Sequence, residues 1–176
     1  MKRLVIKFGV ISGLILVAIS AITVPLHLNG KISMSAGMWL GYTVMTVSFL
    51  PVFLAVRAYR EEHGGVISFG RAFGLGLLIT LVSSLFYVVA WEIVYFGGFL
   101  PGFEERMKAE QVAEMQKEGA SPEKIAQAMK MWELYKNPAF NAAITLLEPL
   151  PPALIVSLVA AGILRRRPDE AAMAAA

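Results

Sequence analysis

The stretch that decides the fold is residues 69–96, which read FGRAFGLGLLITLVSSLFYVVAWEIVYF. Its charged residues are Arg71 and Glu92, each close to one end of the stretch. An apolar run longer than about 18 residues can cross the hydrocarbon layer of a bilayer as a helix. Ser68, directly before the run, is a residue type that caps helix N-termini. We therefore predict a membrane-spanning helix here.

Three more apolar runs, at about residues 4–28, 36–59 and 140–164, have the same character. Across the chain 57% of residues are hydrophobic and 16% are charged, against roughly 45–50% and about 25% in soluble domains. We therefore expect an all-α integral membrane bundle of four transmembrane helices. It should form one domain over residues 1–167, followed by a disordered tail at residues 168–176.

The first run follows Lys2 and Arg3, and a basic start before an apolar run also describes a secretory signal peptide. Against a signal peptide, Lys7 interrupts the run early and apolar residues continue as far as Leu28. We therefore expect an uncleaved membrane anchor.

Proline interrupts three of the four runs. Pro25 lies near the end of the first, Pro51 lies inside the second, and three prolines fall within residues 149–152 of the fourth. Proline has no N–H and clashes with the preceding turn, so it bends or stops a helix. We expect a kink at Pro51. The fourth span should either kink strongly at the proline cluster or begin after it.

Residues 97–138 differ from the four runs because they concentrate charge, with six Lys or Arg and seven Glu. Residues 103–118 favour one helix, and Ser121-Pro122-Glu123 is typical of the start of another. We therefore predict a helical hairpin between the third and fourth spans. Its second helix should either rest on the bilayer or the bundle mouth, or contact a protein partner, through one apolar face. That face carries Ile125, Met129, Trp132 and Tyr135.

Basic residues are distributed unequally between the two sides of the membrane. Four spans place both chain ends on one side, and that side carries most of the Lys and Arg near span ends. The other short loop carries Lys31. Because cytoplasmic loops hold the excess of basic residues, we expect both termini in the cytoplasm and the insertion, residues 97–138, outside. The basic residues concerned are Lys2, Arg3, Lys7, Arg57, Arg60, Arg71 and Arg165–Arg167.

Polar side chains inside the spans are informative because hydrocarbon penalises them. With the orientation above, most lie in the outer half of the bundle, with Glu92 and Glu148 at comparable depth on neighbouring helices. Two close carboxylates could carry a proton or hold a cation. Alternatively, both only hydrogen-bond to Tyr, Trp or backbone groups near the proline kink. The candidate polar pocket comprises Glu92, Glu148, His27, Tyr87, Trp91, Asn141 and Thr145.

Three glycine pairs match the spacing G-x-x-x-G, which lets membrane helices approach closely. Glycine is common in membrane helices, so some matches arise by chance. We interpret the pairs as packing sites between spans: Gly9–Gly13, Gly37–Gly41 and Gly70–Gly74.

Several functional classes lack their sequence signatures. The chain has no cysteine, which excludes disulfides, zinc–thiolate sites and a cysteine nucleophile. His27 has no second histidine beside it to support a metal site. The motifs H-E-x-x-H, G-x-S-x-G and the Walker loop are missing. We expect no cofactor, no metal and no catalytic residues. We also expect no nucleic-acid partner, because the net charge of +3 comes from basic residues at membrane edges.

Residues 64–73 read GGVISFGRAF, and the third span ends in Trp91-Glu92-Ile93-Val94-Tyr95. Asn137-Pro138 precedes the last span, and Leu147-Glu148-Pro149 lies within it before a basic stop. Together these resemble a family of bacterial membrane proteins known as domain of unknown function 4199, over about residues 2–167. The resemblance implies a small bacterial inner-membrane protein with four spans and the same outer insertion. It implies no activity and no catalytic residues.

From these observations we expect a non-enzymatic accessory or interaction protein that presents its outer hairpin. Its partners would be membrane lipid and either another protein or a second copy of the chain. The small size, the missing motifs and the amphipathic face of the insertion favour this function. The alternative is a small transporter, or an ion- or proton-binding protein, that uses Glu92 and Glu148. A membrane enzyme fits least.

Overall fold

The computed structural model describes residues 1–166, and its regular elements are α-helices. Four helical segments are long and apolar enough to cross a membrane, which confirms the all-α class with four spans. The expected disordered tail, residues 168–176, lies outside the described residues. The helices are α1 (Lys2–Leu28), α2 (Met34–Ser48), α3 (Pro51–Glu62), α4 (Phe69–Phe96), α5 (Phe103–Lys117), α6 (Pro122–Tyr135), α7 (Pro138–Leu147) and α8 (Leu150–Leu164).

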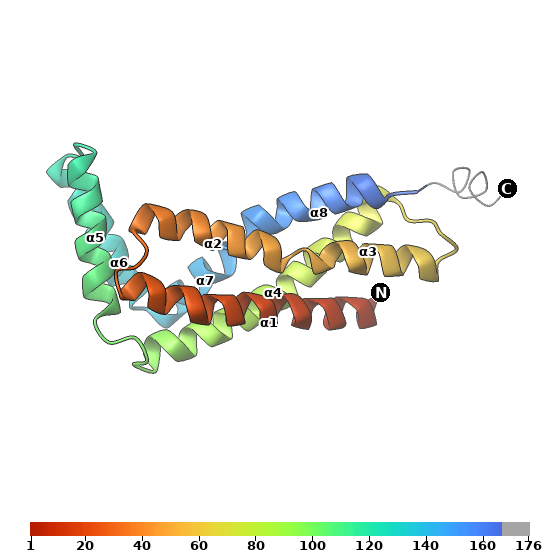
Figure 1. The fold of residues 1–176 in the computed structure, drawn as a ribbon, viewed down its shortest axis with the longest axis horizontal. Helices are drawn as coiled ribbons and strands as arrows, with labels where there is room; N and C mark the ends of the chain where they lie inside the picture. The colour runs from red at the N-terminus through yellow and green to blue at the C-terminus, as the bar shows by residue number, and fades with distance from the viewer. Residues whose placement is uncertain (167–176) are drawn as a thin grey trace.

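The spans run side by side, and α5 and α6 lie across one end of them (Figure 1). The N-terminus, the turn between α3 and α4, and the end of α8 lie at the opposite end. There, Ile67 and Arg166 exchange two backbone hydrogen bonds, which close that end of the bundle. The helical hairpin expected between the third and fourth spans is therefore present, and it covers one end.

Proline divides two of the spans into pairs of helices. The second span is α2 followed by α3, which begins at Pro51, and the fourth is α7 followed by α8. Between α7 and α8 the chain passes through Glu148 and Pro149. The expected interruptions at Pro51 and at the proline cluster are thus confirmed, whereas α1 continues through Pro25 to Leu28. The second interruption places Glu148 at the end of α7.

Side-chain caps mark the starts of four helices, α2, α4, α6 and α7. Ser68 and Ser121 accept hydrogen bonds from the amides of Arg71 and Lys124, as expected of serine at these positions. Asn137 caps α7 by accepting from two amides. Because Asn137 follows the end of α6 almost directly, this cap fixes the point at which the hairpin returns to the bundle.

The bundle buries small polar residues and turns large apolar ones outward. Ser12, Ser83 and Ser157 are fully buried, whereas Leu81 is 50% exposed and Ile163 is 68% exposed. Lipid tails solvate apolar side chains as well as a protein core does, so membrane helices reserve small residues for their contacts. This distribution is typical of a bundle surrounded by lipid.

Close helix contacts centre on α4, which packs against α1 and α8. A Cβ added at Gly9 would lie 2.6 Å from Val82 Cβ, and one added at Gly13 would lie 2.8 Å from Phe86 Cβ. Ser83 Oγ also donates a hydrogen bond to the Gly9 carbonyl oxygen at 3.0 Å. The Gly9–Gly13 pair therefore lies where α1 and α4 approach most closely.

The other two glycine pairs have different surroundings. A Cβ added at Gly41, Gly70 or Gly74 would meet no heavy atom within 4 Å. One added at Gly37 would meet the His27 ring, with Nδ1 at 3.0 Å. Within one chain, the Gly70–Gly74 pair thus has no neighbouring helix at contact distance, because it lies on a side of α4 that no span covers.

Candidate functional site

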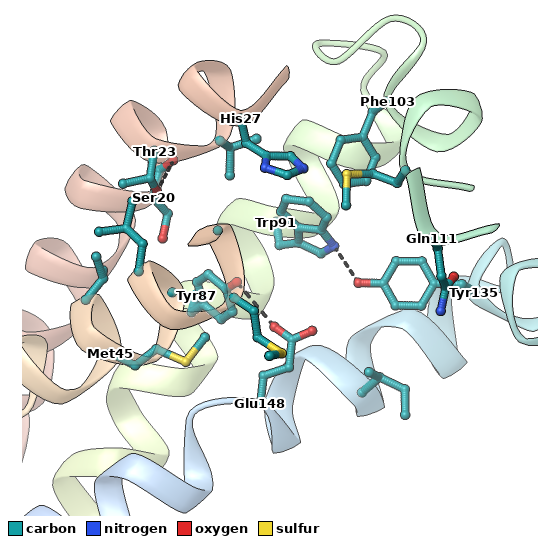
Figure 2. Close-up of a pocket in the computed structure, with 18 of the residues that line it drawn as sticks. Ser20, Thr23, His27, Met45, Tyr87, Trp91, Phe103, Gln111, Tyr135 and Glu148 are labelled. Atoms are coloured by element: carbon teal, nitrogen blue, oxygen red, sulfur yellow. Dashed lines mark hydrogen bonds between the residues drawn. The ribbon is translucent and has the colours of Figure 1, made fainter. Parts of the chain in front are cut away.

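A cavity of about 680 Å³ lies between the spans and the hairpin. Its walls come from α1, α2, α4 and α7, and its roof comes from α5 and α6 (Figure 2). Ligand pockets in proteins have volumes of roughly 300–1,000 Å³ and are mostly apolar with a few placed polar groups. This cavity matches that description. Its polar lining residues are Ser20, Thr23, His27, Tyr87, Trp91, Gln111, Trp132, Tyr135 and Glu148.

Glu148 projects its carboxylate into the cavity from the end of α7 (Figure 2). Tyr87 on α4 donates a hydrogen bond to Glu148 Oε2 at 3.3 Å. No lysine or arginine lines the cavity, and Glu148 makes no ion pair within residues 1–166. An acidic group therefore faces a largely apolar space with one hydroxyl as its hydrogen-bond partner.

Trp91 and Tyr135 join the third span to the hairpin. Trp91 Nε1 donates to Tyr135 Oη at 3.1 Å, and the Tyr95 ring contacts Tyr135 edge to face at 5.5 Å between centroids. Burial raises the pKa of Tyr135 to about 12 and the charge of Glu148 adds to this, although hydrogen bonds with Thr145 and Trp91 act in the opposite direction. Tyr135 is therefore a neutral phenol at physiological pH.

The end of α1 is joined to α5 above the cavity. His27 Nε2 lies 3.2 Å from Glu110 Oε2, within ion-pair distance, although the two groups are not oriented for a hydrogen bond. Arg106 donates to Glu110 Oε1 at 3.1 Å and also to the carbonyl oxygen of Leu28. These contacts hold the roof of the cavity against its α1 wall.

A second charged cluster anchors the other side of the hairpin. Glu104 pairs with Lys108 and Lys136, and Tyr95 Oη donates to Glu104 Oε2 at 3.4 Å. Burial alone would raise the pKa of Glu104, but its hydrogen bonds and charge interactions with the two lysines outweigh burial and lower it. Glu104 is thus an ionised anchor that connects α5 to the end of α4 and, through Lys136, to the end of α6.

The structure divides the predicted pocket residues into three groups. His27, Tyr87, Trp91 and Glu148 all line the cavity. Asn141 and Thr145 are fully buried beside it. Asn141 Nδ2 donates to the Tyr135 carbonyl oxygen at 3.2 Å, and Thr145 Oγ1 donates to Asn141 Oδ1 at 3.2 Å. These two residues therefore hold the cavity wall in place.

Glu92 does not line the cavity. It follows Trp91 directly, so its side chain points about 100° around the helix from the cavity face. Glu92 Oε1 is buried and has no hydrogen-bond partner within residues 1–166. The cavity thus contains one of the two carboxylates that we expected to meet, and the structure does not bring Glu92 to Glu148 there.

The apolar face of the hairpin is turned toward the protein itself. Trp132 and Tyr135 line the cavity, and Trp132 Nε1 donates to Gln111 Oε1 on α5 at 2.7 Å. Ile125 and Met129 on the same helix are half-buried. The side chains expected to rest on the bilayer or the bundle mouth, or to contact a protein partner, therefore include two that have partners within the chain.

Sequence patterns did not indicate every residue that surrounds the cavity. Phe103 and Gln111 reach it from α5, because the hairpin folds back over the spans, and no periodicity shows that rotation. Four methionines also line it, namely Met38, Met45, Met107 and Met131. Within residues 1–166, no group of three or more His, Asp or Glu residues could hold a metal ion.

Comparison with known proteins gives one match. No curated protein and no solved structure matches the chain. A family model matches residues 7–166, which include all eight helices apart from the first residues of α1. The glycine-rich turn before α4 and the Glu148–Pro149 break both lie within the matched range. The chain belongs to the family described as "Protein of unknown function (DUF4199)".

Proposed function

We propose that this protein is a non-catalytic integral membrane protein that binds an amphipathic molecule in the cavity beneath its hairpin. The observation that carries this proposal is the cavity itself, with a volume of about 680 Å³, mostly apolar walls and a few convergent polar groups. A tightly packed bundle needs no such space, because protein interiors are otherwise close-packed. In a membrane, the available occupants of an apolar cavity are lipid-like molecules.

The hairpin acts in this proposal as the roof over a ligand. Support comes from its contacts with the spans, which include Trp91–Tyr135, His27–Glu110 and Tyr95–Glu104. An accessory role toward a protein partner or a second copy would then use the charged outer side of α5 and α6. A proton or cation carrier with paired carboxylates has less support, because Glu148 lines the cavity and Glu92 does not.

We further propose that the hairpin faces outward from a bacterial inner membrane, with both termini in the cytoplasm. Arg57, Arg60 and Arg165 lie close to the ends of α3 and α8, away from the hairpin. Cytoplasmic ends of spans carry the excess of Lys and Arg.

The absence of cysteine makes this orientation directly testable. Glu118→Cys in the hairpin turn should react with a membrane-impermeant maleimide on intact spheroplasts. Glu62→Cys, at the end of α3, should react only after the membrane is permeabilised. Both positions are exposed, so access to the reagent decides the result. The reverse labelling pattern would contradict the proposed orientation.

The ligand proposal can be tested through intrinsic fluorescence. Of the three tryptophans, Trp91 and Trp132 line the cavity, whereas Trp39 is 70% exposed on the outside of the bundle. In a Trp39→Phe background, the remaining emission therefore comes from the cavity. Bromine quenches tryptophan on contact. In maltoside micelles, bromododecyl probes with alcohol, carboxylate or trimethylammonium head groups should be titrated, and at least one should give saturable quenching.

A matched pair of glycine variants separates cavity binding from general partition into the micelle. Gly41 lines the cavity, Gly74 does not, and a Cβ at either position meets no heavy atom within 4 Å. Gly41→Leu should fill part of the cavity and remove the saturable quenching, whereas Gly74→Leu should leave it intact. If no probe gives saturable quenching, or if Gly41→Leu leaves the quenching unchanged, the cavity does not bind amphipathic ligands.

A further inference from the structure

The cavity combines an acidic group with a complete lack of lysine and arginine. Glu148 is the only carboxylate in its lining, and His27 is the only residue there that can carry a positive charge. His27 lies near the end of α1, where its Nε2 is 3.2 Å from Glu110 Oε2, and Arg106 pairs with the same carboxylate. Glu148 is therefore left without a cationic partner in the part of the chain that the structure describes.

Aromatic rings surround this carboxylate. Tyr87, Trp91 and Tyr135 lie around Glu148 in Figure 2, on α4 and α6. Two hydrogen bonds, Tyr87–Glu148 and Trp91–Tyr135, fix the orientation of these side chains. The faces of such rings carry partial negative charge and attract ammonium groups, most strongly where water is excluded. A carboxylate in a cavity that aromatic side chains also line is a recognition chemistry for a positively charged head group.

We infer that the ligand of this cavity is a lipophilic cation, in which an ammonium group rests against Glu148 and a hydrocarbon part fills the rest. This inference rests on the proposed function, which requires only that an amphipathic molecule binds. It adds the sign of the charge on the head group and names Glu148 as the residue that selects this charge. A buried carboxylate without a counter-ion is costly, and a bound ammonium would remove that cost.

The remainder of the cavity suits a hydrocarbon body. Met45 and Met131 line it, together with Leu16, Val44 and Ile144. Methionine is unbranched and flexible, so it adapts to chains of different shape. A head group with a phosphate but no ammonium group would find no lysine or arginine in the lining to neutralise it. The ammonium could come from a free lipophilic amine or from the amine of a lipid head group, and both present the same chemistry to Glu148.

The three bromododecyl probes test the sign of the head group on the parent Trp39→Phe protein, without any change at Glu148. The trimethylammonium probe should bind at least about tenfold more tightly than the alcohol, since a desolvated cation gains from both the rings and the carboxylate. The carboxylate probe should bind more weakly than the alcohol. Each affinity is expressed as the mole fraction of probe in the uncharged micelle at half-maximal quenching.

Glu148→Gln keeps the shape of the side chain and an oxygen for Tyr87, and it should remove most of the preference for the ammonium probe, leaving the smaller part that the aromatic rings supply. Glu92→Gln is the matched control, because it neutralises another carboxylate in a span that does not line the cavity. It should preserve the preference. Phosphatidylethanolamine added to the micelles should compete with the ammonium probe if the natural source is a lipid head group. A lack of competition, with the preference intact, would indicate a free amine.

The outcomes distinguish the two proposals. If saturable quenching is sensitive to Gly41→Leu but equal for the three head groups, the cavity binds amphipathic molecules and the cationic ligand is excluded. The same conclusion follows if the ammonium preference is undiminished in Glu148→Gln. If no probe gives saturable, Gly41→Leu-sensitive quenching, the proposed function itself fails.

Discussion

Replacing Gly76 by leucine should prevent the bundle from assembling, whereas Gly74→Leu, two residues away, should be tolerated. A Cβ added at Gly76 would lie 2.5 Å from Ser157 Oγ, 2.8 Å from Ser157 Cβ and 3.2 Å from Val52 Cγ1. Ser157 and Val52 are both fully buried, so neither can move aside. The substitution would thus force α3 and α8 away from α4. The fraction of monodisperse protein after heating in maltoside micelles measures the effect.

A milder version of this experiment identifies the contact. Gly76→Ala should gain about 1 kcal/mol in helix propensity but lose about 1–3 kcal/mol through overpacking, and the overpacking should dominate at this distance. Ser157→Gly removes both of the closest atoms, so the double variant should recover most of the lost stability. If the Gly76→Leu and Gly74→Leu proteins unfolded at the same temperature, the result would contradict the close contact between Gly76 on α4 and Ser157 on α8.

The four spans could be predicted from the sequence because lipid imposes one simple requirement on each of them. A helix must stay apolar for its whole passage through hydrocarbon, and residues 69–96 satisfy that requirement without any knowledge of their neighbours. The interruptions at Pro51 and Pro149 could be predicted for a similar reason, since proline acts on its own helix. Both are properties of single segments.

Helix contacts could be predicted only in part, because they depend on rotation about each helix axis. The spacing of Gly9 and Gly13 correctly indicated a close approach, and the structure supplies Val82 and Phe86 as the opposing residues. The spacing also selected Gly70 and Gly74, although the glycine at contact distance on α4 is Gly76. Two residues turn the helix by about 200°, which moves a glycine from the core to the periphery. Spacing alone does not reveal which side is covered.

The candidate site shows the same division. Tyr87 and Trp91 are one turn apart on α4, so their shared face could be read from periodicity, and both line the cavity. Glu92 is adjacent in sequence and lies outside the lining. Gln111 and Phe103 reach the cavity because the hairpin folds back over the spans, and nothing in their own segment indicates this. Local patterns found the walls of the site, and the fold alone revealed its roof.

Asn141→Leu should loosen the hairpin from the bundle. The Asn141 side chain is fully buried and donates to the backbone carbonyl oxygen of Tyr135, where α6 ends. Leucine fills a similar space but leaves that carbonyl oxygen and the Thr145 hydroxyl without this partner, which should cost about 1–3 kcal/mol. Because the lost contact joins α6 to α7, the lost free energy should chiefly weaken the docking of the hairpin on the spans. The opening of α6 should then be about 5- to 150-fold more frequent.

Limited proteolysis with trypsin measures this opening when the hairpin recloses quickly compared with cleavage. Cleavage after Lys130, inside α6, requires the helix to open and should accelerate in Asn141→Leu. Cleavage after Lys117, beside the exposed turn at Gly119, requires no undocking and provides an internal control. Equal acceleration at both sites would indicate general destabilisation of the protein rather than release of the hairpin.

Thr145→Val leaves the contact of Asn141 with the Tyr135 carbonyl oxygen in place and removes the hydrogen bond from Thr145 to Asn141. Thr145 donates to Asn141 Oδ1 and also hydrogen-bonds with the Tyr135 side chain, so valine removes both contacts while Asn141 continues to hold the Tyr135 carbonyl oxygen. Its effect on cleavage after Lys130 should still be smaller, because the Tyr135 hydroxyl keeps its hydrogen bond from Trp91 and no buried backbone group loses its partner. If Thr145→Val released α6 more than Asn141→Leu did, the contact between Asn141 and Tyr135 would not be what docks the hairpin. The roof of the cavity would then depend on the charged contacts of Arg106 and Glu104 instead.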